Sequence, residues 1–237
     1  MAIGTPTSIG VNSFTGTVSG SSITFTTSAA IVAGNLAIII IALGSNSTPT
    51  VSSVSDGTNS YTKAVGLNNG GNTVDCEIWY KENAAAVNSG ATVTATLSAG
   101  MSGGSEGWVI QGYQASGVAT ASSLDKTATS ATNSTTPSVS SGTLTQADEI
   151  LFGASYNNNS SRTYTEASGF TNLLTPLGAI GKSLGIGYKI VSSTASVSYA
   201  PTWDVSAGIS MATILASFKA AATAARGHTP GIPLMGL

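Results

Sequence analysis

The chain has 237 residues, which is enough for one large domain or two small ones with a sizeable core. Charged residues make up 8% of it, against roughly 25% in ordinary soluble domains, and the net charge is −2. This composition supplies neither a basic stripe nor an acidic tail, so we expect neither nucleic acid nor an anionic membrane as a partner. Little charge also means little repulsion between copies, which favours a protein that works in an assembly.

Residues 1–10 hold neither a basic region nor an apolar segment, so no secretory signal is visible and we expect synthesis in a cytoplasm. The most apolar run, residues 36–43, is too short for a membrane helix, which needs about twenty residues. Its consecutive isoleucines favour extended backbone, because β-branched side chains fit strands better than helices. We therefore predict a strand that is buried on both faces.

Strand-like runs continue along the chain and are separated by clusters of Gly, Asn, Asp and Ser that form turns. No long amphipathic helix interrupts them, which is typical of a sandwich or a barrel. The expected strands are residues 22–27, 36–43, 74–81, 91–97, 108–113, 150–156, 183–191, 196–199 and 209–218. We predict an all-β fold, an antiparallel β-sandwich of jelly-roll type over residues 1–219.

The two halves of the chain look alike when these runs are aligned. Residues 35–39 match 149–153, 60–62 match 163–165, 78–81 match 186–189, and 91–94 roughly match 195–198. Chance similarity in a Ser- and Thr-rich chain is one explanation. The other is a repeat, which predicts two similar half-sandwiches at about residues 20–114 and 136–219, in one double-sheet domain or as two small domains.

Two segments outside these runs differ in composition. Residues 115–143 are nearly free of large apolar side chains, so we expect a long surface excursion or an edge strand there, and a domain boundary stays open. Residues 219–226 are mostly alanine and predict a short C-terminal helix. Residues 227–237 contain two prolines and three glycines and predict an extended tail.

Motifs for catalysis or metal binding are weak. Residues 100–104 match the Gly-x-Ser-x-Gly elbow, but an expected strand follows where that motif needs a helix, so a hairpin turn is favoured. His228 is the only histidine and has no cysteine nearby, which disfavours a triad and a zinc site. Asp56 could form half of a calcium site, although a turn in which it binds the backbone ahead is favoured. We expect no enzyme, no cofactor and no metal.

Most of the remaining distinctive side chains are expected to pack in the core. The single cysteine, Cys76, lies in an expected strand and should be a buried free thiol. Four aromatic residues within expected strands should also be buried: Trp79, Tyr80, Trp108 and Tyr113. Four tyrosines near expected loops are better placed to contact a carbohydrate, although packing is again the simpler interpretation: Tyr61, Tyr156, Tyr164 and Tyr199.

Three segments resemble parts of a known class of module: DGTNSY at residues 56–61, IWYK at 78–81 and GATVTAT at 90–96. They are similar to β-sandwich modules of tailed-bacteriophage virion proteins, over residues 36–113 and more faintly over 148–218. These are loose turn-and-strand patterns, so no functional residue carries over. The resemblance implies a capsid-decorating, head-spike or tail-associated protein located in the virion.

On this interpretation the protein is a rigid sandwich that forms homo-oligomers through sheet edges or faces, with a trimer expected by analogy. Residues 220–237 would be a tail that docks on another virion protein, a capsid or tail subunit. Its apolar anchors would be Ile232, Pro233, Leu234, Met235 and Leu237. The alternative is a carbohydrate-binding or adhesin module whose polar loops contact glycans through Tyr156, Asn157 and Asn158.

Overall fold

A computed structural model of the chain describes residues 2–15, 20–44, 49–69, 74–101, 107–132, 134–157, 162–174, 183–204 and 210–222. Within these ranges the regular structure consists of strands alone, and the sheets are antiparallel. The predicted all-β, antiparallel class is therefore confirmed. The predicted C-terminal helix is not shown: residue 219 ends the last strand, Ala220 forms an isolated bridge with Val118, and residues 223–237 lie outside the described ranges.

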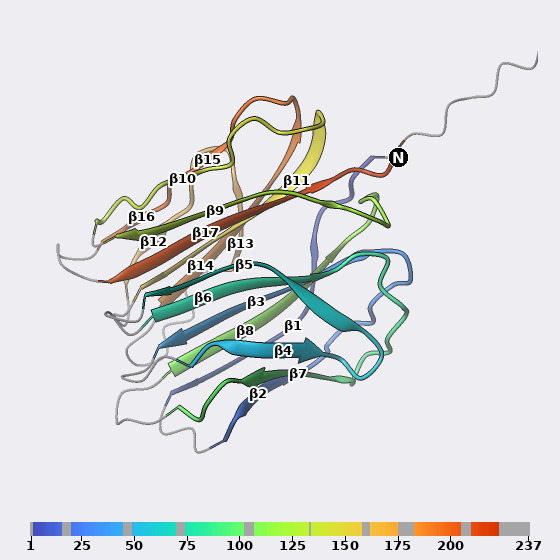
Figure 1. Ribbon diagram of the computed structural model, residues 1–237, viewed down its shortest axis with the longest axis vertical. Helices are drawn as coiled ribbons and strands as arrows, with labels where there is room; N and C mark the ends of the chain where they lie inside the picture. Colours follow the sequence, from blue (N-terminus) through green and yellow to red (C-terminus); the bar gives the residue numbers. More distant parts are fainter. Residues whose placement is uncertain are drawn as a thin grey trace, which may run out of the picture.

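The first sheet curls until its two edge strands almost meet (Figure 1). Its strands, in spatial order, are β1 (Thr7–Thr15), β8 (Gly107–Ala115), β3 (Leu36–Gly44), β6 (Val74–Lys81), β5 (Ser60–Asn69), β4 (Val51–Ser55), β7 (Thr92–Leu97) and β2 (Ser22–Thr26). Between the edges, the backbone N–H of Ser28 donates to the carbonyl oxygen of Ile9 at 2.8 Å, and Asn12 Nδ2 donates to that of Thr24 at 2.8 Å. The sheet is therefore nearly barrel-shaped.

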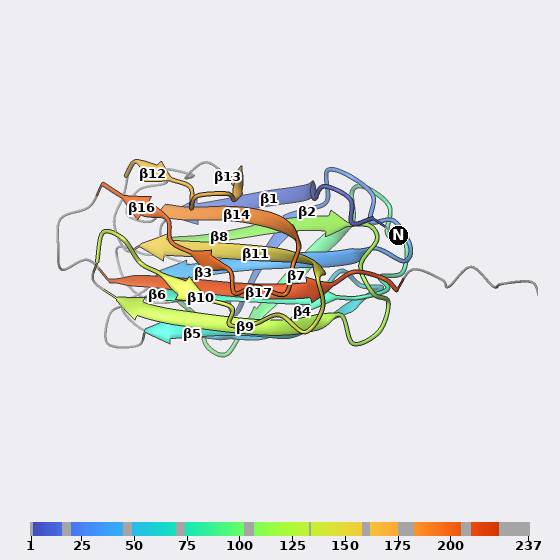
Figure 2. The same ribbon diagram turned by 90° about the horizontal axis from the view of Figure 1, so that it is seen from above.

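The second sheet packs on one face of this near-barrel. Its strands, in spatial order, are β13 (Thr171–Leu174), β14 (Ser183–Ser192), β11 (Asp148–Asn157), β17 (Met211–Lys219) and β9 (Leu124–Thr132). Two short ribbons lie over its other face (Figure 2), β10 (Val139–Ser140) with β15 (Ser198–Tyr199) and β12 (Tyr164–Thr165) with β16 (Thr202–Trp203). The molecule is thus a near-barrel, a sheet and a cover of ribbons and loops.

Strand β3 contributes side chains to two cores, because both of its faces are buried, as its continuous apolar sequence predicts. Residues 36, 38, 40 and 42 belong to the core between the sheets, and residues 37, 39, 41 and 43 to the core inside the near-barrel. A third core, beyond the second sheet, contains Leu151, Leu215, Phe170 and Tyr199. Because alternate side chains of a strand point to opposite faces, β3 lies between the first and second of these cores and β11 between the first and third.

All the strands expected from the sequence are present, and the strand from residue 74 to 81 has the expected bounds. Residues 115–143 contain an edge strand, β9, in agreement with one of the two expectations for that stretch. The pattern did not predict β1, β4 and β5, in which polar residues interrupt the apolar ones without regular alternation, nor the two- to four-residue strands β10, β12, β13 and β16.

The two sheets share one strand order. The order β1-β8-β3-β6-β5 in the first corresponds to β9-β17-β11-β14-β13 in the second. Registers also correspond, since Ile38 lies opposite Tyr80 on one side and Tyr113 on the other, while Phe152 lies opposite Tyr188 and Ala216. The aligned segments 35–39 and 149–153, and 78–81 and 186–189, thus occupy matching places, which is the geometry that a duplication would produce. The aligned residues 60–62 and 163–165 do not, since the first begin β5 and residues 164–165 of the second form β12 in a separate ribbon. The exact domain limits stay a prediction.

Candidate functional site

Several of the residues singled out by the sequence lie outside the described ranges. They are the five docking-tail anchors Ile232, Pro233, Leu234, Met235 and Leu237, the glycan-contact candidate Asn158, and His228. The Gly-x-Ser-x-Gly segment is described only up to Met101, and the structure resumes at Gly107 with strand β8, so a strand follows it as expected. The expected hairpin is wrong, because the flanking strands are not neighbours in the sheet: β7 pairs with β2 and β4, whereas β8 pairs with β1 and β3.

The other two glycan-contact candidates are not on the surface. Tyr156 and Asn157 are both 0% exposed, and the Tyr156 ring belongs to the core between the two sheets. The exposure inferred from the nearby turn signal is therefore wrong, because β11 is an inner strand whose end is covered on both faces. Tyr199 is also fully buried, and its ring packs on Phe170 with centroids 4.9 Å apart.

Asp56 forms a turn whose hydrogen bonds occupy both of its carboxylate oxygens. Oδ1 accepts from the backbone N–H groups of Thr58 at 2.9 Å and Asn59 at 2.6 Å, and Oδ2 accepts from Asn59 Nδ2 and from the Tyr61 hydroxyl, each at 3.0 Å. Asn59 in turn bonds the backbone of Ala85 through both of its amide atoms. The turn interpretation of Asp56 is confirmed, and this network fastens the β4–β5 hairpin to the loop after β6.

Two carboxyl groups of β6 point into the near-barrel. Asp75 and Glu77 are each 1% exposed. Glu77 Oε1 lies 2.9 Å from Lys63 Nζ and accepts from the Val51 N–H at 3.2 Å, while Oε2 accepts from Trp79 Nε1 at 2.6 Å. Burial, followed by the charge and hydrogen bond of Glu77, raises the pKa of Asp75 to about 8. At neutral pH the pair therefore holds a proton inside the barrel. The groups that bond Glu77 are all side chains or backbone of this same sheet.

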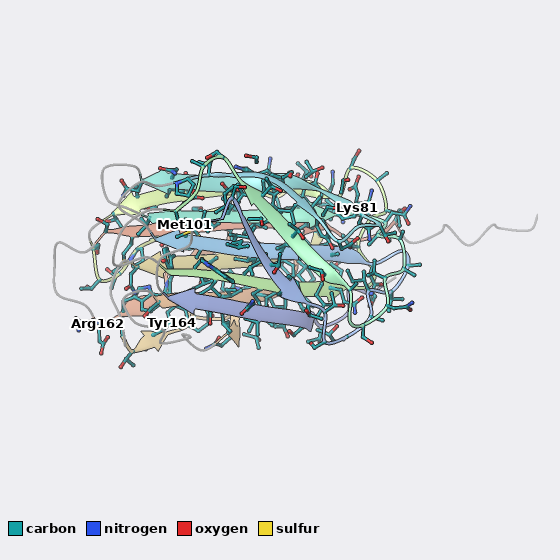
Figure 3. All side chains as sticks on the ribbon, turned by 90° about the horizontal axis from the view of Figure 1, so that it is seen from below. Lys81, Met101, Arg162 and Tyr164 are labelled. Atoms are coloured by element: carbon teal, nitrogen blue, oxygen red, sulfur yellow. The ribbon has the colours of Figure 1, made fainter. Side chains whose placement is uncertain are left out.

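The second sheet holds a corresponding polar cluster over glycines. The Tyr164 hydroxyl donates to Glu166 Oε1 at 2.8 Å and lies 2.7 Å from the Tyr199 hydroxyl. A Cβ added to Gly153 would come within 2.5 Å of the Tyr199 ring, and one added to Gly185 within 2.4 Å of the Tyr164 ring. Each glycine is therefore a place where an aromatic ring lies directly on the backbone. Tyr164 and Arg162 mark this end of the molecule, opposite to Lys81 (Figure 3).

A further buried carboxyl lies beside strand β9. Glu149 is fully buried, and this burial, with neighbouring Asp125 adding to the effect, raises the pKa of Glu149 to about 7. Asp125 accepts hydrogen bonds from the Thr145 backbone N–H at 2.8 Å and from its hydroxyl at 2.5 Å. These contacts hold the beginning of β9 in place and leave the rest of the strand untouched.

Strand β9 is an edge strand with several exposed side chains. β9 pairs with β17 on one side and with no described strand on its other side. Residues 127–132, which we call the β9 edge, contain only Thr, Ala and Ser, and the side chains of Thr127, Thr129 and Ala131 are exposed. The Thr- and Ala-rich sequence of this segment is compatible with a strand. It does not indicate whether another strand would pair with its outer side.

The described ranges contain no group of three His, Cys, Asp or Glu side chains that could hold a metal ion. They also contain no helix with the length and apolar character needed to span a bilayer. No protein-family model matches the sequence, and a search of curated proteins gives no match. Among the described residues we take the β9 edge as the candidate functional site, because the outer side of this strand has no paired strand.

Proposed function

We propose that this protein is a structural component of a tailed-bacteriophage virion that decorates a capsid or attaches to a tail, and that it acts through protein contacts without catalysis. The observation that carries the proposal is the β9 edge, an uncharged segment whose outer side has no paired strand among the described residues. The similarity of residues 56–61, 78–81 and 90–96 to phage modules is the reason for proposing a phage particle as the assembly.

The architecture suits a rigid building block. We take the two packed sheets as a variant of the jelly-roll-like sandwich in which the first sheet has curled on itself. Two of the resembling segments belong to its hydrogen-bonded framework, because residues 56–61 form the Asp56 turn and residues 78–81 belong to β6. A surface with few charges adds little repulsion when many copies crowd on a particle.

Attachment to the particle would use residues 220–237, with Ile232, Pro233, Leu234, Met235 and Leu237 as apolar anchors on a capsid or tail subunit. Residue 222 ends the described ranges just after Ala221, whose N–H donates to the carbonyl oxygen of Gly117 at 2.8 Å. Deletion of residues 227–237 removes none of the described contacts, so we expect a folded protein that no longer enters particles. Unchanged incorporation of the deleted chain would contradict the docking role.

The proposal is tested by looking for the chain in purified phage particles. We expect mass spectrometry to detect it in particles banded on a density gradient, and immunogold electron microscopy to place it at regular positions on the head or tail. A chain found only in the unassembled fraction would contradict the proposal. A glycan-binding role receives no support from Tyr156 and Asn157, since both side chains are buried.

A further inference from the structure

The edges of the two sheets differ in how they are closed. In the first sheet, β1 and β2 approach each other and exchange the Ser28 and Asn12 hydrogen bonds. In the second sheet, β13 is a four-residue strand with an irregular register at its only pairing. Short strands and irregular registers are ordinary ways in which proteins prevent unwanted strand pairing. β9 has neither protection over residues 127–132.

Strand β9 is also the counterpart of β1, because each is the first strand of its half and the neighbour of β8 or β17. The free side of β1 faces β2, while the second half has only the two-residue β10 in the place of β2. The β9 edge therefore lacks the strand that its counterpart has. A backbone edge with unpaired N–H and C=O groups is a template for another strand.

We propose that the β9 edges of two copies of this chain pair with each other, antiparallel about a twofold axis, so that their second sheets become one continuous sheet. This inference rests on the proposed role as an assembly component and names its first contact. It gives a pair of chains as the unit, in place of the trimer expected by analogy. A closed twofold contact uses the same surface on both copies, which a single strand supplies.

The distribution of charge on β9 favours this partner and this direction. The strand's two charged side chains, Asp125 and Lys126, are both near its beginning, and residues 127–132 have none. An antiparallel pair centred on Thr129 places Lys126 opposite Thr132 of the other copy, so that like charges never face each other. A parallel pair would bring the two Asp125–Lys126 segments together at one end. Opposed threonines also form favourable cross-strand pairs in antiparallel sheets.

The test measures the mass of the full-length chain in solution by sedimentation across a wide range of concentrations. We expect a reversible dimer for the natural chain. Thr129→Lys and Thr129→Glu each place two like charges opposite one another at the twofold axis, so each variant should bind to itself at least about tenfold more weakly. An equimolar mixture of the two variants places Lys opposite Glu and should restore the dimer.

The matched control is Thr171→Lys, which puts the same charge on an exposed threonine of the other edge strand, β13, and should leave the dimer unchanged. Circular dichroism and thermal unfolding confirm that each variant is folded. A natural chain that stays monomeric, or Thr129 variants that stay dimeric, would overturn the inference. Monomeric variants that fail to pair when mixed would also overturn it and indicate a strand from another protein. A monomeric chain that is nevertheless found in particles would leave the proposed function standing without this contact.

Discussion

Strands β6 and β14 occupy the same place in their sheets, yet the faces that they turn away from the other sheet are built in opposite ways. β6 fills its face with its own side chains, Glu77 and Trp79. At the matching positions β14 has Gly185 and Gly187, and the space is filled by Tyr164 and Glu166 from outside the sheet. The same strand order and register are therefore compatible with large side chains on the strand itself or with glycines covered by side chains from another segment.

This difference follows how each sheet covers that face. The first sheet continues through β5 into β4, β7 and β2 and closes over its own side chains. The second sheet ends at β13, and short ribbons and loops provide the cover. The ribbons contribute large aromatic side chains such as Tyr199 and Trp203, so the strands beneath them have small residues where these rings pack. The same incomplete cover leaves β9 open at the sheet's edge.

The largest effect is expected from making β6 resemble β14 through Trp79→Gly. The indole is buried in the near-barrel, and no neighbouring segment stands ready to fill its place as Tyr164 and Glu166 do on the second sheet. Loss of a buried aromatic side chain should lower the free energy of unfolding by about 3–5 kcal/mol, measured by urea denaturation. The control is Ile190→Ala on β14, whose side chain is 41% exposed and whose loss should cost less than about 0.5 kcal/mol. If the two variants lose the same free energy of unfolding, the neighbouring side chains repack into the space left by the indole.

The buried carboxyls of the two sheets should make the protein less stable as the pH rises. The folded-state pKa of Asp75 is raised from 3.8 to about 8, so the folded state binds its proton more tightly than the unfolded state. The resulting stabilisation is complete below the unfolded pKa and is lost between these two values, at up to about 1.4 kcal/mol per pH unit. Asp75→Asn should flatten this dependence when urea denaturation is repeated across the window.

The second sheet gives a matched comparison, because burial raises the pKa of Glu149 from 4.5 to about 7. Glu149→Gln should therefore remove a slope that ends one pH unit earlier than the slope removed by Asp75→Asn. If both variants keep the pH dependence of the natural chain, neither carboxyl holds a proton in the folded state.

An intermediate effect is expected from the opposite exchange, in which β14 is made to resemble β6 through Gly185→Ala. The added Cβ would lie 2.4 Å from the Tyr164 ring, and such overpacking costs about 1–3 kcal/mol. The double variant with Tyr164→Ala removes the obstructing ring, so the cost of Gly185→Ala should shrink in that background. Gly20→Ala is the control, since its Cβ would meet nothing nearer than 4.0 Å. Additive costs in the double variant would contradict direct contact between ring and backbone.

The comparison also shows how far the sequence predicts this fold. The continuous apolar runs of β3 and β11 and the matching IWYK and IGYK segments predict central strands, since burial on both faces leaves an apolar pattern. Closure of the first sheet is not predictable in this way. It depends on contacts such as Ser28 with Ile9, between segments whose own patterns say only that each is extended.

The candidate site is less predictable than the fold. Tyr156 and Tyr199 stand beside turn residues, yet they are buried because distant strands and loops cover them. The glycines at 153, 185 and 187 read as weak points in strands, while their role depends on rings from another part of the chain. The open side of β9 is likewise a property of the whole sheet, since it requires that no other strand reach it.

The smallest effects should separate the matched tyrosines of the two halves. Tyr61→Phe removes one hydrogen bond to Asp56, which keeps its bonds from Thr58 and from the backbone and side chain of Asn59, so we expect a cost of about 1 kcal/mol. Tyr164→Phe leaves Glu166 Oε1 with only the Ala167 N–H and removes the partner of the Tyr199 hydroxyl, so we expect about 2 kcal/mol.

The order of these two costs matters more than their size, because it reports how each half stabilises its inner face. A larger cost for Tyr164→Phe means that the second sheet depends on a polar network laid over glycines, whose members lose their partners together. A larger cost for Tyr61→Phe would instead make the Asp56 turn the critical connection and reduce the glycine-bound cluster to space filling. Thermal unfolding of both variants at one pH, with Tyr188→Phe on β14 as the control for a partly buried tyrosine, distinguishes the two results.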